Sequence, residues 1–136
     1  MRLLVFLAKG FETIEFSAFI DVMGWAKTDF DCDIETVICG LNSKVVGSFN
    51  VSVLVDKTIE KVSADDYDAL AIPGGFEEFG FYEEAYNEKL LDLIRQFNSQ
   101  KKWIATVCVG ALPDGKSGVL TGRRATTNHL SGAQKQ

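Results

Sequence analysis

Cys108 is the residue of this sequence whose type and position are best suited to chemistry. It follows the apolar run 103–107, and a segment that can form a helix comes after Gly110. A nucleophile on a sharp turn between a strand and a helix is a nucleophile elbow, here with cysteine in place of serine. Backbone N–H groups at the start of the helix would favour the thiolate, and the sharp turn predicts a positive φ or another strained conformation. The alternative interpretation is a buried cysteine that only fills space.

Two glutamates could act with this cysteine. Glu12 and Glu15 follow the apolar run 2–8, and their spacing of three places them near one face of a predicted helix. A thiolate and a carboxylate repel each other, so the pair works only if Glu15 keeps its proton and shares one negative charge with the sulfur. Such a thiolate is nucleophilic and is also open to oxidation to a sulfinic acid. The alternative is that Glu15 is a solvated helix residue.

Gly74 and Gly75 follow a third apolar run, 68–73. Lacking Cβ atoms, they can aim backbone N–H groups at one point, as an oxyanion hole requires, although such a pair is more often a plain turn. His129, the single histidine, is either an auxiliary base or a surface residue. Open α/β sheets bind ligands at the carboxyl ends of their strands, so we expect Cys108, the glutamates and the glycines to meet there.

The elements that must position these residues alternate along the chain as short apolar runs and amphipathic stretches. This pattern is typical of an α/β protein with a mostly parallel sheet and helices on both faces. The predicted strands are 2–8, 33–39, 44–47, 50–55, 68–73, 103–107 and 124–127, with the third and fourth forming a hairpin. Near-continuous apolar character places 2–8, 68–73 and 103–107 at the centre of the sheet. A purely antiparallel sheet, or 103–107 on an exposed edge, would contradict this interpretation.

Two long helices are predicted from their periodicity. One covers about 12–26 and the other about 84–100; the residues expected to face the core are Ile14, Ala18, Val22 and Trp25 in the first and Leu90, Leu91, Ile94 and Phe97 in the second. Pro113 and Gly115 predict that the helix after Cys108 is short, kinked or frayed, and Asp114 is polar where an apolar contact is expected. The polar tail 131–136 is expected to be exposed and mobile.

Composition describes one ordinary globular domain. The chain has 136 residues, of which 46% are hydrophobic and 24% charged. No apolar run approaches the ~20 residues of a membrane span and no leader precedes the first strand, so we expect a cytoplasmic protein without a membrane partner. The net charge of −5 argues against nucleic acid as a partner. Cys32, Cys39 and Cys108 lack CxxC spacing, so neither a disulfide framework nor a zinc site is expected.

Four segments together resemble the ThiJ/PfpI superfamily, which holds PfpI-type intracellular proteases and the Parkinsonism-associated deglycases. They are residues 7–15, 67–75, 105–111 and 118–127, and the resemblance covers essentially the whole chain. It implies a flavodoxin-like three-layer α/β sandwich related to the class I glutamine amidotransferases. It also implies that Glu15 hydrogen-bonds Cys108 and that Gly74 or Gly75, together with Val109, offers backbone N–H groups. No metal or organic cofactor is implied, and relatives of this type are commonly homodimers.

The chain departs from the family pattern at several positions. The deglycase branch has a histidine after the Thr-Thr pair, where this chain has Asn128; His129 comes one residue later and would face the other side of a strand. The protease branch has a histidine directly after the nucleophile, where this chain has Val109. Family members also continue with a further strand and a terminal helix, which we expect to be absent from this single domain of residues 1–136.

Three functional interpretations stay open. The first is an enzyme in which Cys108 attacks a small carbonyl or amide substrate, by deglycation, glyoxalase-type conversion or amide hydrolysis. The second is a redox-sensing or protective stress module that uses oxidation of Cys108. The third is a degenerate, non-catalytic member of the family.

Overall fold

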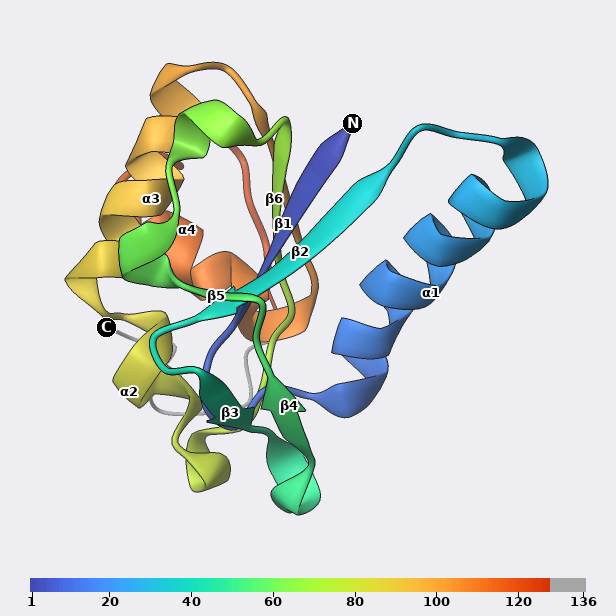
Figure 1. Cartoon of the computed structure of the whole chain (residues 1–136). Coiled ribbons are helices and arrows are strands. Elements are labelled where there is room, and N and C mark those ends of the chain that lie inside the picture. Colours follow the sequence, from blue (N-terminus) through green and yellow to red (C-terminus); the bar gives the residue numbers. More distant parts are fainter. Residues whose placement is uncertain (128–136) are drawn as a thin grey trace.

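A computed structural model describes residues 1–127 of the chain (Figure 1). The strands are β1 (Arg2–Leu7), β2 (Glu35–Gly40), β3 (Lys44–Val46), β4 (Ser52–Leu54), β5 (Lys57–Thr58), β6 (Ala69–Ile72) and β7 (Trp103–Thr106). The α-helices are α1 (Thr13–Phe30), α2 (Phe81–Ala85), α3 (Glu88–Ser99) and α4 (Ala111–Ser117). Short 3-10 turns connect them; those used below are η1 (Ser48–Asn50), η4 (Glu77–Phe79) and η5 (Cys108–Gly110).

Five of these strands form one parallel sheet in the order β5-β2-β1-β6-β7. β3 and β4 pair antiparallel in a separate hairpin, as the sequence predicts. Figure 1 shows α1 on one side of the sheet and α2, α3 and α4 on the other. The mostly parallel α/β fold expected from the alternating pattern is therefore confirmed.

The period-2 alternation of β1 feeds two cores, one on each face of the sheet. Leu4 and Phe6 pack with α3, whose predicted core residues Leu90, Leu91, Ile94 and Phe97 are all buried. Leu3, Val5 and Leu7 point the other way, into a smaller cluster beneath α1. A strand buried on both faces explains why its sequence is apolar throughout.

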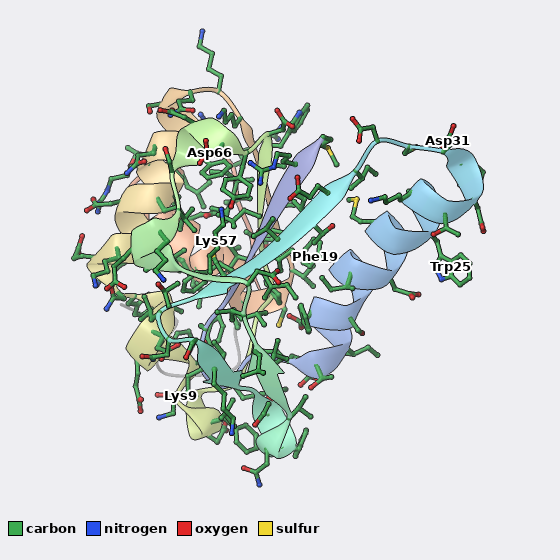
Figure 2. All side chains as sticks on the ribbon, in the orientation of Figure 1. Lys9, Phe19, Trp25, Asp31, Lys57 and Asp66 are labelled. Carbon is green, nitrogen blue, oxygen red and sulfur yellow. The ribbon has the colours of Figure 1, made fainter. Side chains whose placement is uncertain are left out.

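The sequence prediction for α1 had the correct helix but the wrong face. Glu12 caps its first turn and Asp31 ends it in the left-handed region at φ 51°. The residues packed against the sheet are Phe16, Phe19, Ile20 and Met23. Ile14, Val22 and Trp25 are 72%, 62% and 55% exposed, and Figure 2 shows Trp25 on the outer side of the helix and Phe19 on the side of the sheet. Both faces of α1 are apolar, so periodicity alone could not select the inner one.

The expected central position of 103–107 is also wrong. β7 pairs with β6 and is the edge strand of the sheet within residues 1–127, with Trp103 79% and Val107 41% exposed. An apolar sequence indicates that both faces of a strand can be buried. It does not determine whether a second strand pairs with each edge, because the neighbouring strands come from other segments of the chain.

Other differences are local. The predicted helix 84–100 is two helices, since Asn87 begins α3 by accepting a hydrogen bond from the Lys89 N–H. The two-residue strand β5 was not predicted, and residues 124–127 form no strand. The helix after the cysteine, α4, is short as expected: Pro113 lies in its first turn, where the missing N–H costs no intrahelical bond. The tail 131–136 lies outside the described residues.

Candidate active site

The carboxyl ends of β1, β6 and β7 bring three loops to one edge of the sheet. β1 pairs with β2 on one side and with β6 on the other, so the chain changes direction across the sheet between β1 and β6. Ligands of open α/β sheets bind at such a switch point. The loop after β1 leads to Glu12 and Glu15, the loop after β6 begins with Pro73, Gly74 and Gly75, and β7 leads to Cys108.

Cys108 occupies the strained turn that the sequence predicts, with φ at 54°. Val107 before it is extended, and the 3-10 turn η5 and then α4 follow. A non-glycine residue in the left-handed region costs roughly 1–2 kcal/mol. Gly110 lets this turn lie against β6, because a Cβ there would stand 2.3 Å from the Ile72 carbonyl oxygen. The prediction of a positive φ is confirmed, and the Cys108 side chain is half-buried.

Glu15 is anchored to the loop after β6. Its Oε2 accepts a 2.7 Å hydrogen bond from the Gly74 N–H. A Cβ on Gly74 would lie 2.8 Å from that oxygen and 3.1 Å from both the Val107 carbonyl oxygen and Val109 Cγ2. The Glu15 carboxylate and the two residues that flank Cys108 therefore converge on the same glycine.

The two glycines differ in what they can offer a substrate. The Gly74 N–H is engaged by Glu15, and the Gly74 carbonyl accepts from the Glu12 N–H at 2.9 Å. Gly75 forms an isolated β-bridge with Phe11, so close that a Cβ would stand 2.3 Å from the Gly10 carbonyl oxygen. Gly75 and Val109 thus remain as the candidate N–H donors for an oxyanion.

The auxiliary residues fall into two groups. Glu12 is the N-cap of α1, and its Oε1 accepts from the Ile14 N–H at 3.4 Å, which is a structural role. Asn128 and His129 lie outside the described residues. A contact that sequence reasoning did not anticipate comes from Thr127, whose hydroxyl donates to the Cys108 carbonyl oxygen at 2.9 Å. The local sequence pattern around Thr127 predicts only a strand and gives no sign of this contact.

The three cysteines stand in different environments, and none of them is in a disulfide within residues 1–127. Cys32 is exposed, whereas Cys39 is buried on β2. Burial raises the pKa of the Cys39 thiol to about 12, so this thiol stays protonated at neutral pH. Within the same residues no group of three histidine, cysteine or acidic side chains could hold a metal ion. No helix in the described part is long and apolar enough to cross a membrane.

Several known proteins are similar in sequence to much of this chain. Protein dj-1beta of Drosophila melanogaster is 32% identical over 128 residues, which cover 91% of this chain and 63% of the relative. Deglycase PfpI of Pyrococcus furiosus is 35% identical over 83 residues, covering 61% of this chain and 48% of the relative. An uncharacterized protein of Methanocaldococcus jannaschii is 32% identical over 91 residues, which span 43% of its length. The chain thus spans only about half the length of several curated relatives.

Solved structures agree with this result. The crystal structure of Drosophila melanogaster DJ-1beta superposes with a TM-score of 0.74 at 30% identity, covering 86% of this chain and 60% of that one. The structure titled Toxoplasma gondii DJ-1, oxidized, gives a TM-score of 0.76 at 28% identity, with 93% and 66% covered. The family model for the DJ-1/PfpI family matches residues 1–135. The chain belongs to the DJ-1/PfpI family.

Proposed function

We propose that this chain is a cysteine-dependent enzyme acting on small carbonyl or amide substrates through Cys108 and Glu15. The observation that carries the proposal is the convergence on Gly74: the Glu15 carboxyl group accepts a hydrogen bond from its N–H, and the residues on both sides of the strained Cys108 approach the same glycine. The name of Deglycase PfpI supports this class of activity.

The first step is the same for each substrate class. The Cys108 thiolate attacks the carbonyl carbon, a C–S bond forms, and the π electron pair of the carbonyl moves to its oxygen. The N–H groups of Gly75 and Val109 would stabilise that oxyanion, and protonated Glu15 would supply its proton. The hydrogen bond from Gly74 fixes the Glu15 carboxyl group before the substrate arrives, so its orientation costs little during the reaction.

The second step depends on the substrate. With an α-oxoaldehyde the hemithioacetal loses its C1 proton to Glu15 and regains a proton at C2, while the proton of the C1 hydroxyl passes to the C2 oxygen. The product of this rearrangement is a thioester of a 2-hydroxy acid. Water then hydrolyses the thioester and releases the acid and the thiol, so the overall change is redox-neutral. With an amide the hydroxyl of the tetrahedral intermediate returns its proton to Glu15 as the carbonyl re-forms and the C–N bond breaks. Glu15 passes this proton to the leaving amine, and water then hydrolyses the thioester to the acid and the Cys108 thiol.

The experiment is turnover of methylglyoxal, followed as formation of lactate, by wild-type protein and by Cys108→Ser. Alkylation by iodoacetamide is measured in parallel in a Cys32→Ser background, because Cys32 is exposed and would react on its own. We expect loss of turnover and of fast alkylation in Cys108→Ser with an unchanged circular dichroism spectrum. Equal turnover with and without Cys108 would refute the proposal.

A second candidate function is redox sensing, which the half-buried Cys108 thiol also permits. Two equivalents of peroxide would convert the thiolate first to a sulfenate and then to a sulfinate, releasing two waters. Mass spectrometry of the Cys108 peptide after mild peroxide tests this role. Oxidation without turnover would favour the sensor, and neither property would favour a non-catalytic member.

We also propose a homodimer formed through the outer face of α1. This face exposes Ile14, Val22 and Trp25, which no other part of residues 1–127 covers.

A further inference from the structure

Three phenylalanines form an exposed cluster beside the candidate active site, which we call the aromatic platform: Phe49, Phe76 and Phe79. Their side chains come from η1 and from the loop that contains η4, which Figure 1 shows at the end of the sheet where β1 and β6 finish. The rings of Phe49 and Phe79 pack edge to face at 5.3 Å between centroids, and those of Phe76 and Phe79 at 6.4 Å. The three residues are 74%, 45% and 37% exposed.

The backbone holds Phe49 outward at an energetic cost. Phe49 and Asn50 both have left-handed φ values, 56° and 63°. Neither is glycine, so the conformation is strained and persists only because neighbouring contacts enforce it. Ser48 supplies these contacts: its N–H donates to the Phe11 carbonyl oxygen at 2.9 Å, and its buried hydroxyl donates to the Gly10 or Phe11 carbonyl oxygen. A strained turn that exposes an aromatic ring contributes nothing to the hydrophobic core.

The platform is rigidly tied to the loops that carry the site. Gly10 receives a hydrogen bond from the Phe76 N–H at 3.1 Å and donates to the Val46 carbonyl oxygen at 2.8 Å. A Cβ on Gly10 would stand 2.8 Å from the Phe79 carbonyl oxygen. Phe76 lies two residues after Gly74, a separation of at most about 7 Å between Cα atoms. The backbone of Phe76 therefore lies close to the glycine at which Glu15 and the Cys108 turn meet.

The charges around the platform are acidic. Glu77 and Glu78 lie between Phe76 and Phe79 in the sequence and are exposed. The nearby cation Lys9 is paired with Glu83 at 2.7 Å, and Figure 2 places Lys9 at the same end of the molecule. Aromatic faces flanked by carboxylates are suited to a guanidinium group, which stacks on rings and pairs with carboxylates.

We propose that the aromatic platform is a binding subsite for an arginine side chain of a polypeptide, which places a neighbouring modified residue at Cys108. The inference rests on the proposed function, because that residue would carry the reacting carbonyl or amide. A substrate as small as methylglyoxal cannot reach from Cys108 to three rings on two loops, whereas an extended polypeptide can. The partner is thus a basic polypeptide segment.

The test measures binding alone, with Cys108→Ser protein, so that it does not depend on turnover. A fluorescein-labelled peptide Gly-Arg-Gly-Arg-Gly is compared with the same peptide carrying Glu or Leu at both Arg positions, by fluorescence anisotropy. We expect the Arg peptide to bind, to weaken about fivefold or more in Phe79→Ala, and to weaken also in the Glu77→Gln, Glu78→Gln double variant. Phe30→Ala is the matched control, since Phe30 is 77% exposed but lies at the far end of α1.

Several results would overturn the subsite. These are equal binding of the Leu peptide, an effect of Phe30→Ala as large as that of Phe79→Ala, or no measurable binding of the Arg peptide. A change of molecular mass in Phe79→Ala by light scattering would instead assign the platform to contact with a second copy. Wild-type protein that binds the Arg peptide but converts no methylglyoxal would refute the proposed turnover and leave the subsite standing.

Discussion

Glu15 and Gly74 are joined by one hydrogen bond that connects the loop after β1 to the loop after β6. The Gly74 N–H donates to Glu15 Oε2 at 2.7 Å, and the carbonyl of the same glycine accepts from the Glu12 N–H. Because the Val107 carbonyl and the Val109 side chain approach the same Cα, this bond sets where the carboxyl group lies relative to the Cys108 turn. A single glycine thus couples the carboxyl group to the turn that carries the sulfur.

Gly74→Ala should disturb the site more than the fold. The new Cβ would stand 2.8 Å from Glu15 Oε2 and 3.1 Å from the Val107 carbonyl oxygen, so the carboxylate and the turn must separate. We expect a loss of stability of about 1–3 kcal/mol, as for other overpacked sites, and a fall of tenfold or more in alkylation of Cys108. Urea unfolding and site-resolved mass spectrometry measure the two effects.

Gly115→Ala is the matched control for this substitution. Gly115 lies in α4, and among the described residues no atom outside its own stretch of helix lies within 4 Å of the position where a Cβ would stand. Alanine therefore fits there and should stabilise the helix by up to about 1 kcal/mol. Equal alkylation rates in wild type, Gly74→Ala and Gly115→Ala would show that Gly74 does not set the geometry around Cys108.

Glu15→Gln separates positioning from proton transfer. The amide oxygen of glutamine can still accept from the Gly74 N–H, but the side chain no longer exchanges a proton. Alkylation of Cys108 should persist within a few fold, whereas turnover of methylglyoxal should fall by about 10²–10⁴. Glu88→Gln on α3, where the carboxylate is exposed, is the control and should leave turnover at the wild-type rate. Unchanged turnover in Glu15→Gln would exclude Glu15 as the proton carrier.

Asp114 makes stability depend on pH. Burial raises the pKa of its carboxyl group from 3.8 to about 7, and Oδ1 has no hydrogen-bond partner among the described residues. Between about pH 4 and 7 the folded protein therefore holds a proton that the unfolded chain has released, so the free energy of unfolding falls as pH rises through this window. The loss amounts to at most roughly 4 kcal/mol and levels off above the folded pKa.

Asp114→Asn should remove this dependence. The variant should have a higher Tm than wild type at pH 8 and nearly the same Tm at pH 4, because asparagine is neutral throughout. Asp29→Asn, at an exposed position near the end of α1, should not change the pH profile. Parallel Tm profiles for wild type and Asp114→Asn from pH 4 to 8 would contradict the assignment.

The exposed apolar side chains on the outer face of α1 lead us to predict a homodimer. Light scattering at micromolar concentration should give the mass of a dimer for wild type. Val22→Glu places a charge in the middle of the proposed contact and should give a monomer. Leu54→Glu, at a still more exposed position on β4, should remain dimeric. A wild-type monomer under these conditions would refute the homodimer.

Much of the fold could be predicted from local sequence. The apolar runs at β1 and β6 and the buried face of α3 follow from periodicity, and the short α4 follows from Pro113. The positive φ at Cys108 follows in the same way, since a strand that turns sharply into a helix requires a strained residue at the corner. These features depend on residues that are close together in the chain, so they can be predicted from the sequence alone.

Other features were decided only by tertiary structure. The sequence placed β7 at the centre of the sheet and buried the face of α1 that carries Ile14 and Trp25; the structure puts β7 at the edge and exposes that face. The engagement of the Gly74 N–H by Glu15 joins residues 59 positions apart, and the aromatic platform joins η1 to the loop of η4. The free energy of an apolar side chain favours its burial, but it does not determine which residues cover it. Those residues come from distant segments, whose positions are fixed only when the whole sheet forms.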